Sequence, residues 1–384
     1  MWYLGVEIGG TKLQIAVGRG EGEPFRALWR GDIDAAQGAA RIHQQIVSGI
    51  DELLAQARLE RKSIAGVGIG FGGPVDTARG QVVTSHQVAG WDAFPLVQWF
   101  EANLGLPAVL HNDADSAAYA EAHFGAGRGF DPVLYITVGS GIGGGLVYGG
   151  RIFRGSGAGA LEIGHLRPGG LPRHVSVAGD SVESIASGFG IEDRARRTIA
   201  EWEAASELVA SRFALSELGR AESDRAEIAL SEMARADEAD SGKPAFTAAG
   251  GRRFPERFAT LMKLVDGNCD RISTRVIAQA ARQGDRLSRE LLWDATSTLG
   301  WAVAQAITLI NPGRIVIGGG VSLIGQDEFF EPVREACAAA VFKPFSGIAE
   351  IVPAALVEEV VIHGALALAR DAFQPETVLK AFVP

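Results

Sequence analysis

Cysteine and long hydrophobic segments are both scarce in this chain. Its 384 residues include only Cys269 and Cys337, far apart, which predicts free thiols in a reducing compartment rather than a disulfide framework. The apolar stretch at residues 299–310 is too short and too broken to cross a bilayer. The N-terminus shows neither the basic segment nor the long apolar segment of a secretory leader. We therefore expect a cytoplasmic protein with no membrane partner.

Basic residues are outnumbered by acidic ones. Lys and Arg total 36 against 46 Asp and Glu, which gives a net charge of −10. Because binding to a phosphate backbone needs a basic surface, this charge argues against nucleic acid as the main partner. It leaves open a small phosphorylated ligand held by backbone amides.

Strand and helix signals alternate along the chain, which predicts an α/β protein, and the length suits two domains. We expect an N-terminal α/β domain at residues 1–113, with a C-terminal helix at about 362–384 packing back on it. A larger α/β domain is expected at 114–361, with a helical insertion at about 191–275 that includes a mobile loop at 237–253.

Apolar runs and helical spacing give the expected elements. Strands are expected at 2–8, 12–18, 25–31, 64–70, 107–111, 132–138, 146–148 and 314–320. Helices are expected at 37–58, 114–124, 287–310 and 365–373. The segments 2–18 and 132–148 both read as a strand, a glycine turn and a second strand, which suggests a repeated architecture.

Two glycine turns, at residues 9–12 and 139–145, lie between strand-like segments. The second contains G-x-G-x-x-G, but a dinucleotide-binding turn leads into a helix, and the residues that follow here read as a strand. The first lacks the spacing and the helix of a Walker A loop. Two such hairpins can instead grip a phosphate chain from two sides with backbone amides and hydroxyls. The candidate phosphate-binding residues are Gly9, Gly10, Thr11, Lys12, Thr137, Gly139, Ser140 and Gly141.

A third glycine cluster, with Gly318 and Gly319, ends a strand that we expect to be buried. It is consistent with the lining of an adenine or ribose pocket, and equally with a plain strand-to-helix turn.

Asp113 follows the strand at 107–111 and falls in the first turn of the expected helix. The helix dipole favours a charged carboxylate there, which suits a general base for a sugar hydroxyl. An acidic residue at this position is also typical of an ordinary helix cap. Asn112 beside it can both donate to and accept from a hydroxyl ligand.

Glu162 and His165 follow a glycine-rich loop, and Glu183 begins a further expected helix. Carboxylates, an amide and an imidazole are typical of a sugar pocket, where each hydroxyl needs a hydrogen-bond partner. A metal site is less favoured, because no cysteine or second histidine follows His165 at metal-ligand spacing.

Eight motifs, taken in order, resemble those of the ROK sugar kinases (repressor, open reading frame, kinase), which belong to the actin/hexokinase-like superfamily. The resemblance spans nearly the whole chain, although each motif alone is weak. The motifs are G-G-T-K (9–12), G-I-G-F-G-G-P-V-D (68–76), N-D-A-D (112–115), T-V-G-S-G-I-G-G-G (137–145), E-I-G-H (162–165), E-S-I-A-S-G (183–188), A-A-R-Q-G-D (280–285) and N-P-G-R-I-V-I-G-G-G-V (311–321).

The resemblance implies two RNase-H-like (actin/hexokinase-type) domains around a central cleft, with the ATP phosphates between the two hairpins. It makes Asp113 the base that takes the proton from the sugar 6-hydroxyl, while Mg²⁺ and hairpin amides offset the charge on the phosphoryl group. Family members are often dimers or tetramers, so a homo-oligomer is expected. The residues at the family's sugar-binding positions are Gly73, Asn112, Glu162, His165 and Glu183.

Two departures from the family pattern stand out. Glu7 replaces the usual aspartate before I-G-G-T-K, and we expect it to organise a hydrated Mg²⁺ as that aspartate is thought to do. Many members also carry a zinc site, with a histidine and three cysteines just after the E-x-G-H stretch. Residues 164–183 contain no cysteine here, so we predict no zinc.

The favoured function is an ATP-dependent kinase, glucokinase-like, acting on a hexose or an N-acetylhexosamine. Glu7 and the missing cysteines keep open a family member that binds sugar without phosphorylating it. A sugar-responsive regulator is the third reading, but such regulators carry a helix-turn-helix segment, whereas this acidic chain starts on its first strand.

Overall fold

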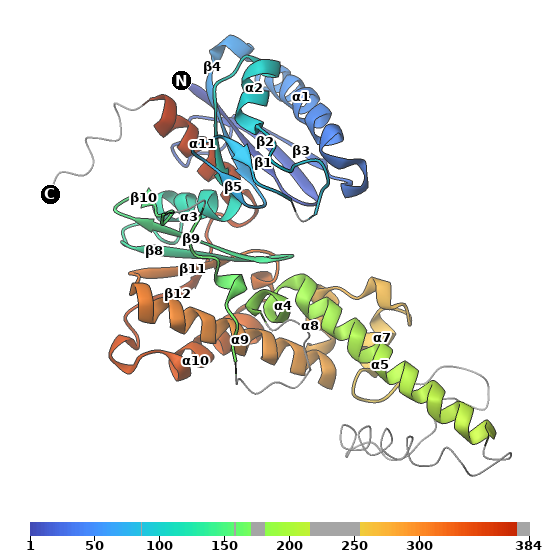
Figure 1. Cartoon of the computed structure of the whole chain (residues 1–384). Coiled ribbons are helices and arrows are strands. Elements are labelled where there is room, and N and C mark those ends of the chain that lie inside the picture. The colour runs from blue at the N-terminus through green and yellow to red at the C-terminus, as the bar shows by residue number, and fades with distance from the viewer. Residues whose placement is uncertain (86, 157–158, 170–180, 216–253, 375–384) are drawn as a thin grey trace.

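The structure is a computed structural model that describes residues 1–85, 87–156, 159–169, 181–215 and 254–374. The expected loop at 237–253 and the end of the expected C-terminal helix, 375–384, lie outside the described residues. Two five-stranded mixed sheets dominate the fold, one in the upper and one in the lower part of Figure 1. Within the described residues, no helix has the length and apolarity that a membrane span requires.

The upper sheet has the order β3-β2-β1-β4-β7. Its outer pairs β3–β2 and β2–β1 are antiparallel, whereas β1–β4 and β4–β7 are parallel. All five strands were expected within a few residues. They are β1 (Trp2–Ile8), β2 (Lys12–Gly18), β3 (Ala27–Asp32), β4 (Ile64–Phe71) and β7 (Ala108–Asn112).

The lower sheet has the order β10-β9-β8-β11-β12 and repeats the same pattern of strand directions. The repeated architecture suggested by the two glycine hairpins is thus confirmed at the level of topology. The strands are β8 (Val133–Val138), β9 (Ile142–Tyr148), β10 (Arg151–Ile152), β11 (Arg314–Gly318) and β12 (Glu350–Pro353).

Strand β9 begins at Ile142, four residues before the expected start at 146. Glycines disfavour strands, but here they are needed because α3 (Asp113–Phe124) packs directly on this strand. A Cβ on Gly145 would lie 2.7 Å from the carbonyl oxygen of Ala114 and 2.7 Å from the Cβ of Ala118. The glycine turn is therefore shorter than expected, because only residues 139–141 separate the two strands.

The chain passes from the upper to the lower sheet through β7 and α3, and it returns through β12 and α11 (Val360–Phe373). These two helices lie side by side between the sheets (Figure 1), with α11 against the upper sheet and α3 against the lower. Their backbones touch, because a Cβ on Gly364 would lie 1.9 Å from the carbonyl oxygen of Ser116.

Other helices cover the outer faces of the two sheets (Figure 1). Against the upper sheet, α2 (Leu96–Leu104) follows the short strand β6 (Gln81–Val82). The helix α1 (Gly38–Ala57) packs on the same sheet and buries Ile42, Ile46, Ile50, Leu53 and Leu54. The lower helices share one core, in which Arg194 of α5 and Asp294 of α9 form a fully buried ion pair. These helices are α4 (Val182–Ala186), α5 (Gly188–Leu215), α7 (Ala259–Leu264), α8 (Thr274–Arg282), α9 (Arg286–Ile310) and α10 (Glu331–Ala340).

Candidate functional site

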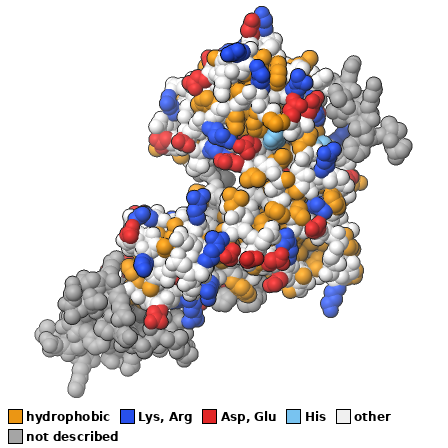
Figure 2. Space-filling view, turned by 180° about the vertical axis from the view of Figure 1, so that it is seen from behind, with side chains coloured by type: hydrophobic (Ala, Val, Ile, Leu, Met, Phe, Trp, Pro, Cys, Tyr) orange, Lys and Arg blue, Asp and Glu red, His pale blue; other side chains and the backbone are white. Residues whose placement is uncertain are grey.

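The surface is hollowed between the upper and lower parts of the molecule, as Figure 2 shows from behind. The β1–β2 hairpin belongs to the upper part, and its turn is closed by a hydrogen bond from Gly9 N to Lys12 O (3.0 Å). Lys12 does not point freely toward a ligand. Its Nζ lies 3.4 Å from Oε1 of Glu358 and 4.0 Å from Oε1 of Glu7. The charge of Lys12 is therefore shared between these two carboxylates.

The β8–β9 hairpin of the lower sheet is closed by a hydrogen bond from Gly139 N to Gly141 O (2.9 Å). The first turn of α5 supports it, because Gly188 N donates to Gly139 O (2.8 Å) and Phe189 N donates to Ser140 O (3.3 Å). These bonds fix the hairpin's carbonyl side to a helix N-terminus. Ser140 at the tip of the turn stays exposed.

Gly318 and Gly319 lie beside this second hairpin. Gly318 pairs with Thr137 across β11 and β8. Gly319 has a φ of 88°, and a Cβ there would lie 2.5 Å from the carbonyl oxygen of Val138, so only glycine fits. The structure thus brings Thr137, the turn 139–141 and the third glycine cluster together, as a common phosphate and nucleoside site would require.

Asp113 is the first residue of α3, and Asn112 is its N-cap. The Asn112 side chain accepts from Ala114 N (2.8 Å) and donates through Nδ2 to the carbonyl oxygen of Gly73 (3.0 Å). Asp113 Oδ1 also accepts from Ala114 N (2.8 Å), which leaves Oδ2 for other partners. Asn112 thus caps the helix, and the predicted base is the next residue, Asp113.

The loop after β4 brings Asp113 next to the first hairpin. A Cβ on Gly72 would lie 3.4 Å from the Cα of Gly9 and 3.5 Å from Oδ2 of Asp113. These are ordinary van der Waals distances, so Gly72 packs between the first hairpin and the carboxylate of Asp113.

Burial raises the pKa of two carboxylic acids beside the first hairpin, Asp113 and Glu7. Burial raises the pKa of Asp113 to about 6, against the hydrogen bond from Ala114 and with a smaller contribution from the charge of Glu162. Burial likewise raises the pKa of Glu7 to about 7, although Lys12 and Gln14 favour its charged form. The charge of Asp113 also raises the pKa of Glu7, so this part of the cleft can take up a proton near neutral pH.

The other predicted sugar-binding residues, Glu162, His165 and Glu183, differ in their contacts. Glu162 interacts electrostatically with Asp113 and precedes a short 3-10 turn, Ile163–His165. His165 has an exposed side chain that makes no hydrogen bond or ion pair with another described residue. Glu183 lies in the first turn of α4, and its Oε2 accepts from Ile142 N (2.7 Å) at the end of the second hairpin. Glu183 therefore braces the second hairpin.

A comparison with known protein families matches residues 3–235 and 248–372 to the ROK family. The chain belongs to the ROK family. A ROK family glucokinase from Streptomyces griseus, solved with glucose and AMPPNP, is similar with a TM-score of 0.69 and 27% identity, covering 97% of this chain and 100% of that chain. The predicted actin/hexokinase-type fold is thereby confirmed.

Two curated relatives extend the ROK comparison. The glucokinase of Streptomyces coelicolor is 29% identical over 371 residues, which is 96% of this chain and 97% of the relative. The bifunctional enzyme NanE/NanK of Brucella melitensis is 30% identical over 378 residues, which is 96% of this chain and 54% of that enzyme. Relatives with different names thus have similar identities to this ROK chain.

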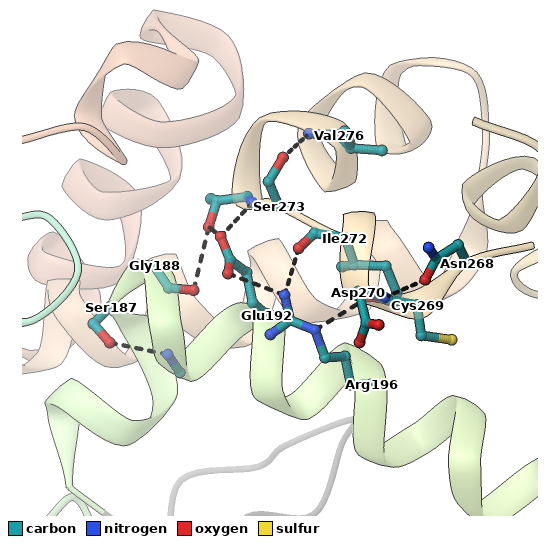
Figure 3. Close-up of polar contacts among 12 residues, drawn as sticks. Ser187, Gly188, Glu192, Arg196, Asn268, Cys269, Asp270, Ile272, Ser273 and Val276 are labelled. Atoms are coloured by element: carbon teal, nitrogen blue, oxygen red, sulfur yellow. Dashed lines mark hydrogen bonds and ion pairs between the residues drawn. The ribbon is translucent and has the colours of Figure 1, made fainter. Parts of the chain in front are cut away.

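Part of the region expected to be a helical insertion supports the second glycine hairpin of this ROK chain. Figure 3 shows Glu192 and Arg196 projecting from α5 toward the loop that precedes α8. Oε1 of Glu192 accepts from the backbone N (2.9 Å) and the hydroxyl (3.2 Å) of Thr274, and Nη2 of Arg196 donates to the carbonyl oxygen of Ile272 (2.6 Å). A Cβ on Gly188 would lie 3.5 Å from the Thr274 hydroxyl.

Through these contacts, α5 is held by the start of α8 and in turn supports the second hairpin. The sequence carried one signal for it, the motif E-S-I-A-S-G at 183–188, which ends at the first residue of α5. Nothing in the sequence pattern marked Glu192 or Thr274, because their pairing depends on two segments far apart in the chain.

Proposed function

We propose that this chain is an ATP-dependent sugar kinase that transfers the γ-phosphoryl group to the 6-hydroxyl of a hexose or an N-acetylhexosamine. Asp113 is the general base, and the two glycine hairpins hold the phosphates of ATP. Asn112, Glu162, His165, Glu183 and the loop at Gly73 bind the sugar hydroxyls.

The position of Asp113 carries the proposal. Its carboxylate stands at the N-terminus of α3, beside the first hairpin, with a pKa raised to about 6. A base with such a pKa is largely ionised at neutral pH and can still accept a proton from a hydroxyl group as the phosphoryl group transfers. The S. griseus relative was solved with glucose and an ATP analogue, which supports the same pair of substrates.

The residues around Glu7 fit a hydrated Mg²⁺. One carboxylate oxygen of Glu7 accepts from Gln14 (2.8 Å), and the other lies 4.0 Å from Nζ of Lys12 and makes no hydrogen bond to another described residue. A free carboxylate oxygen close to the proposed phosphate hairpin is the type of ligand that Mg²⁺ prefers, commonly through water. When bound, the ion would offset charge on the phosphates. Glu7 would hold it, and Asp113 would remain the group that takes the proton.

Two parts of the proposal rest on the sequence alone. The expected absence of zinc follows from the cysteine-free segment 164–183, of which residues 170–180 lie outside the described structure. The choice of sugar depends on pocket shape. The glucokinase relative, at 29% identity, supports a hexose, and the N-acetylhexosamine alternative follows from the family resemblance.

An ADP-release assay with glucose, N-acetylglucosamine, N-acetylmannosamine, fructose and allose tests the proposal. We expect sugar-dependent ADP release with at least one of them, and a product phosphorylated at the 6-hydroxyl. A protein that binds both sugar and nucleotide but releases no ADP with any sugar would instead be the sugar-binding, non-phosphorylating member.

The activity is expected to depend on pH in the range set by Asp113 and Glu7. Both groups must be ionised to act, and burial raises both pKa values, to about 6 and about 7. Hence kcat/KM for the sugar should be highest above about pH 7.5 and should fall as the pH drops through 7 and 6, well above the range of ordinary carboxylates. On the acid side, a slope approaching two in a plot of log kcat/KM against pH would indicate that the charges of both Asp113 and Glu7 are needed. A profile that stays flat down to about pH 5 would contradict the assignment.

A further inference from the structure

Gln87 lies against the first glycine hairpin, although no sequence motif marks it. A Cβ on Gly10 would lie 1.2 Å from Oε1 and 2.4 Å from Cδ of Gln87. The carboxamide therefore occupies the space directly beside the Cα of Gly10. This contact joins the loop between β6 (Gln81–Val82) and α2 to the turn between β1 and β2.

The backbone of this loop is anchored, which directs the Gln87 side chain toward the hairpin. The Ser85 hydroxyl accepts from Gln87 N (3.4 Å) and from Val88 N (3.2 Å). Val88 is buried in the upper core, and the carbonyl oxygen of Ala89 accepts from Ala39 N at the start of α1 (2.9 Å). Gln87 itself remains exposed, so a ligand in the cleft can reach its amide.

The same loop passes the proposed acceptor site. A Cβ on Gly73 would lie 3.2 Å from the carbonyl oxygen of Thr84, and the Gly73 carbonyl is held by Asn112. Gly10 follows Gly9, the residue that approaches the loop at Gly72 next to Asp113. The Gln87 amide thus lies one residue along the turn from the glycine that neighbours Gly72 and, through it, Asp113.

The chemistry of a carboxamide suits a phosphoryl group at this place. Its NH₂ group donates two hydrogen bonds and carries no charge. It can therefore bind a phosphoryl oxygen without forming an ion pair with carboxylates, as Lys12 of the same hairpin does with Glu7 and Glu358. Of the three phosphates of ATP, the one being transferred has to lie nearest to Asp113, because that residue activates the attacking hydroxyl.

We propose that Gln87 contacts the γ-phosphoryl group of ATP, donating a hydrogen bond from Nε2 to one of its oxygens and so positioning it for transfer. The inference rests on the proposed kinase function and deepens it, since it assigns a residue to the phosphate that only ATP, and not ADP, carries.

Nucleotide binding tests this contact without requiring turnover. Calorimetry should show that Gln87→Ala weakens the binding of AMPPNP about tenfold and leaves the affinity for ADP unchanged, because a hydrogen bond to a charged group is lost. Gln87→Glu keeps the length but removes the donor and adds a negative charge, so it should weaken AMPPNP binding at least as much. Gln44→Ala, an exposed glutamine on α1, is the matched control and should change neither affinity.

Kinetics provide a second readout. Gln87→Ala should lower kcat for sugar phosphorylation about tenfold, with the KM of the sugar unchanged. A raised KM for the sugar with normal kcat, or an equal loss of AMPPNP and ADP binding, would overturn the assignment while leaving the kinase function intact. Wild-type protein that binds neither nucleotide would overturn both proposals.

Discussion

Asp113→Asn is expected to lower kcat for sugar phosphorylation by about 10²- to 10⁴-fold, the range attributed to a positioned general base. Asparagine keeps the oxygen that accepts from Ala114 N and fits the same space, so the first turn of α3 and the cap at Asn112 should persist. What is lost is the ability to take the proton from the sugar hydroxyl. The measurement is a steady-state comparison of ADP release at saturating ATP, with the sugar affinity determined separately by calorimetry.

The stability of the same variant separates a catalytic role from a structural one. Because burial raises the pKa of Asp113, the folded state disfavours its charged form. The stabilisation that a raised pKa provides is present below the unfolded-state pKa and is lost as the pH rises through about 6. Removal of the charge should therefore leave the variant no less stable than wild type at pH 8 by urea unfolding. A variant that transfers phosphate at the wild-type rate would rule out Asp113 as the base.

Gly364→Val is expected to destabilise the fold by at least about 3 kcal/mol, which is large for one substitution. A Cβ on Gly364 would lie 1.9 Å from the carbonyl oxygen and 2.5 Å from the carbonyl carbon of Ser116. Both atoms are backbone of α3, so no side chain can rotate away to make room. Nor can α11 shift freely, since a Cβ on Gly68 of β4 would lie 1.8 Å from the carbonyl oxygen of Ala365. Urea unfolding followed by circular dichroism measures the loss.

Gly364→Ala makes the test sharper. Helix propensity alone predicts that alanine would stabilise α11 by about 1 kcal/mol, whereas the contact with Ser116 predicts a loss. Ala372→Val, at an exposed position of the same helix, is the control and should cost less than about 1 kcal/mol. An increase in the stability of Gly364→Ala would mean that α3 and α11 do not touch at this point.

Sequence patterns predicted the fold well where local and tertiary preferences agree. The hairpin β1–β2 and the helix α1 have nearly their expected bounds, because apolar runs flank a glycine turn in one and helical spacing marks the other. The strand β9 began earlier than expected, since its glycines serve the approach of α3 and not the strand itself. Short-range preference and long-range packing conflict there, and packing decides.

The candidate site was only partly accessible from sequence. A strand end followed by a helix start placed Asn112 and Asp113 together, and the structure has them so. The approach of Gly72 to Gly9, the support of the second hairpin by α5 and the contact of Gln87 with Gly10 all join distant segments. No local pattern encodes such contacts. The roles of the site residues in binding and catalysis stay predictions.

The position of α11 in the chain has a consequence for how the protein is made. This helix covers one face of the upper sheet, where Ile362, Leu366 and Ala369 pack with Tyr3 and Ala16. A ribosome releases the strands of that sheet long before residues 360–373. The nascent upper half therefore keeps an apolar face uncovered until residues 360–373 have been synthesised. This interval is expected to be the stage of folding most dependent on protection from aggregation.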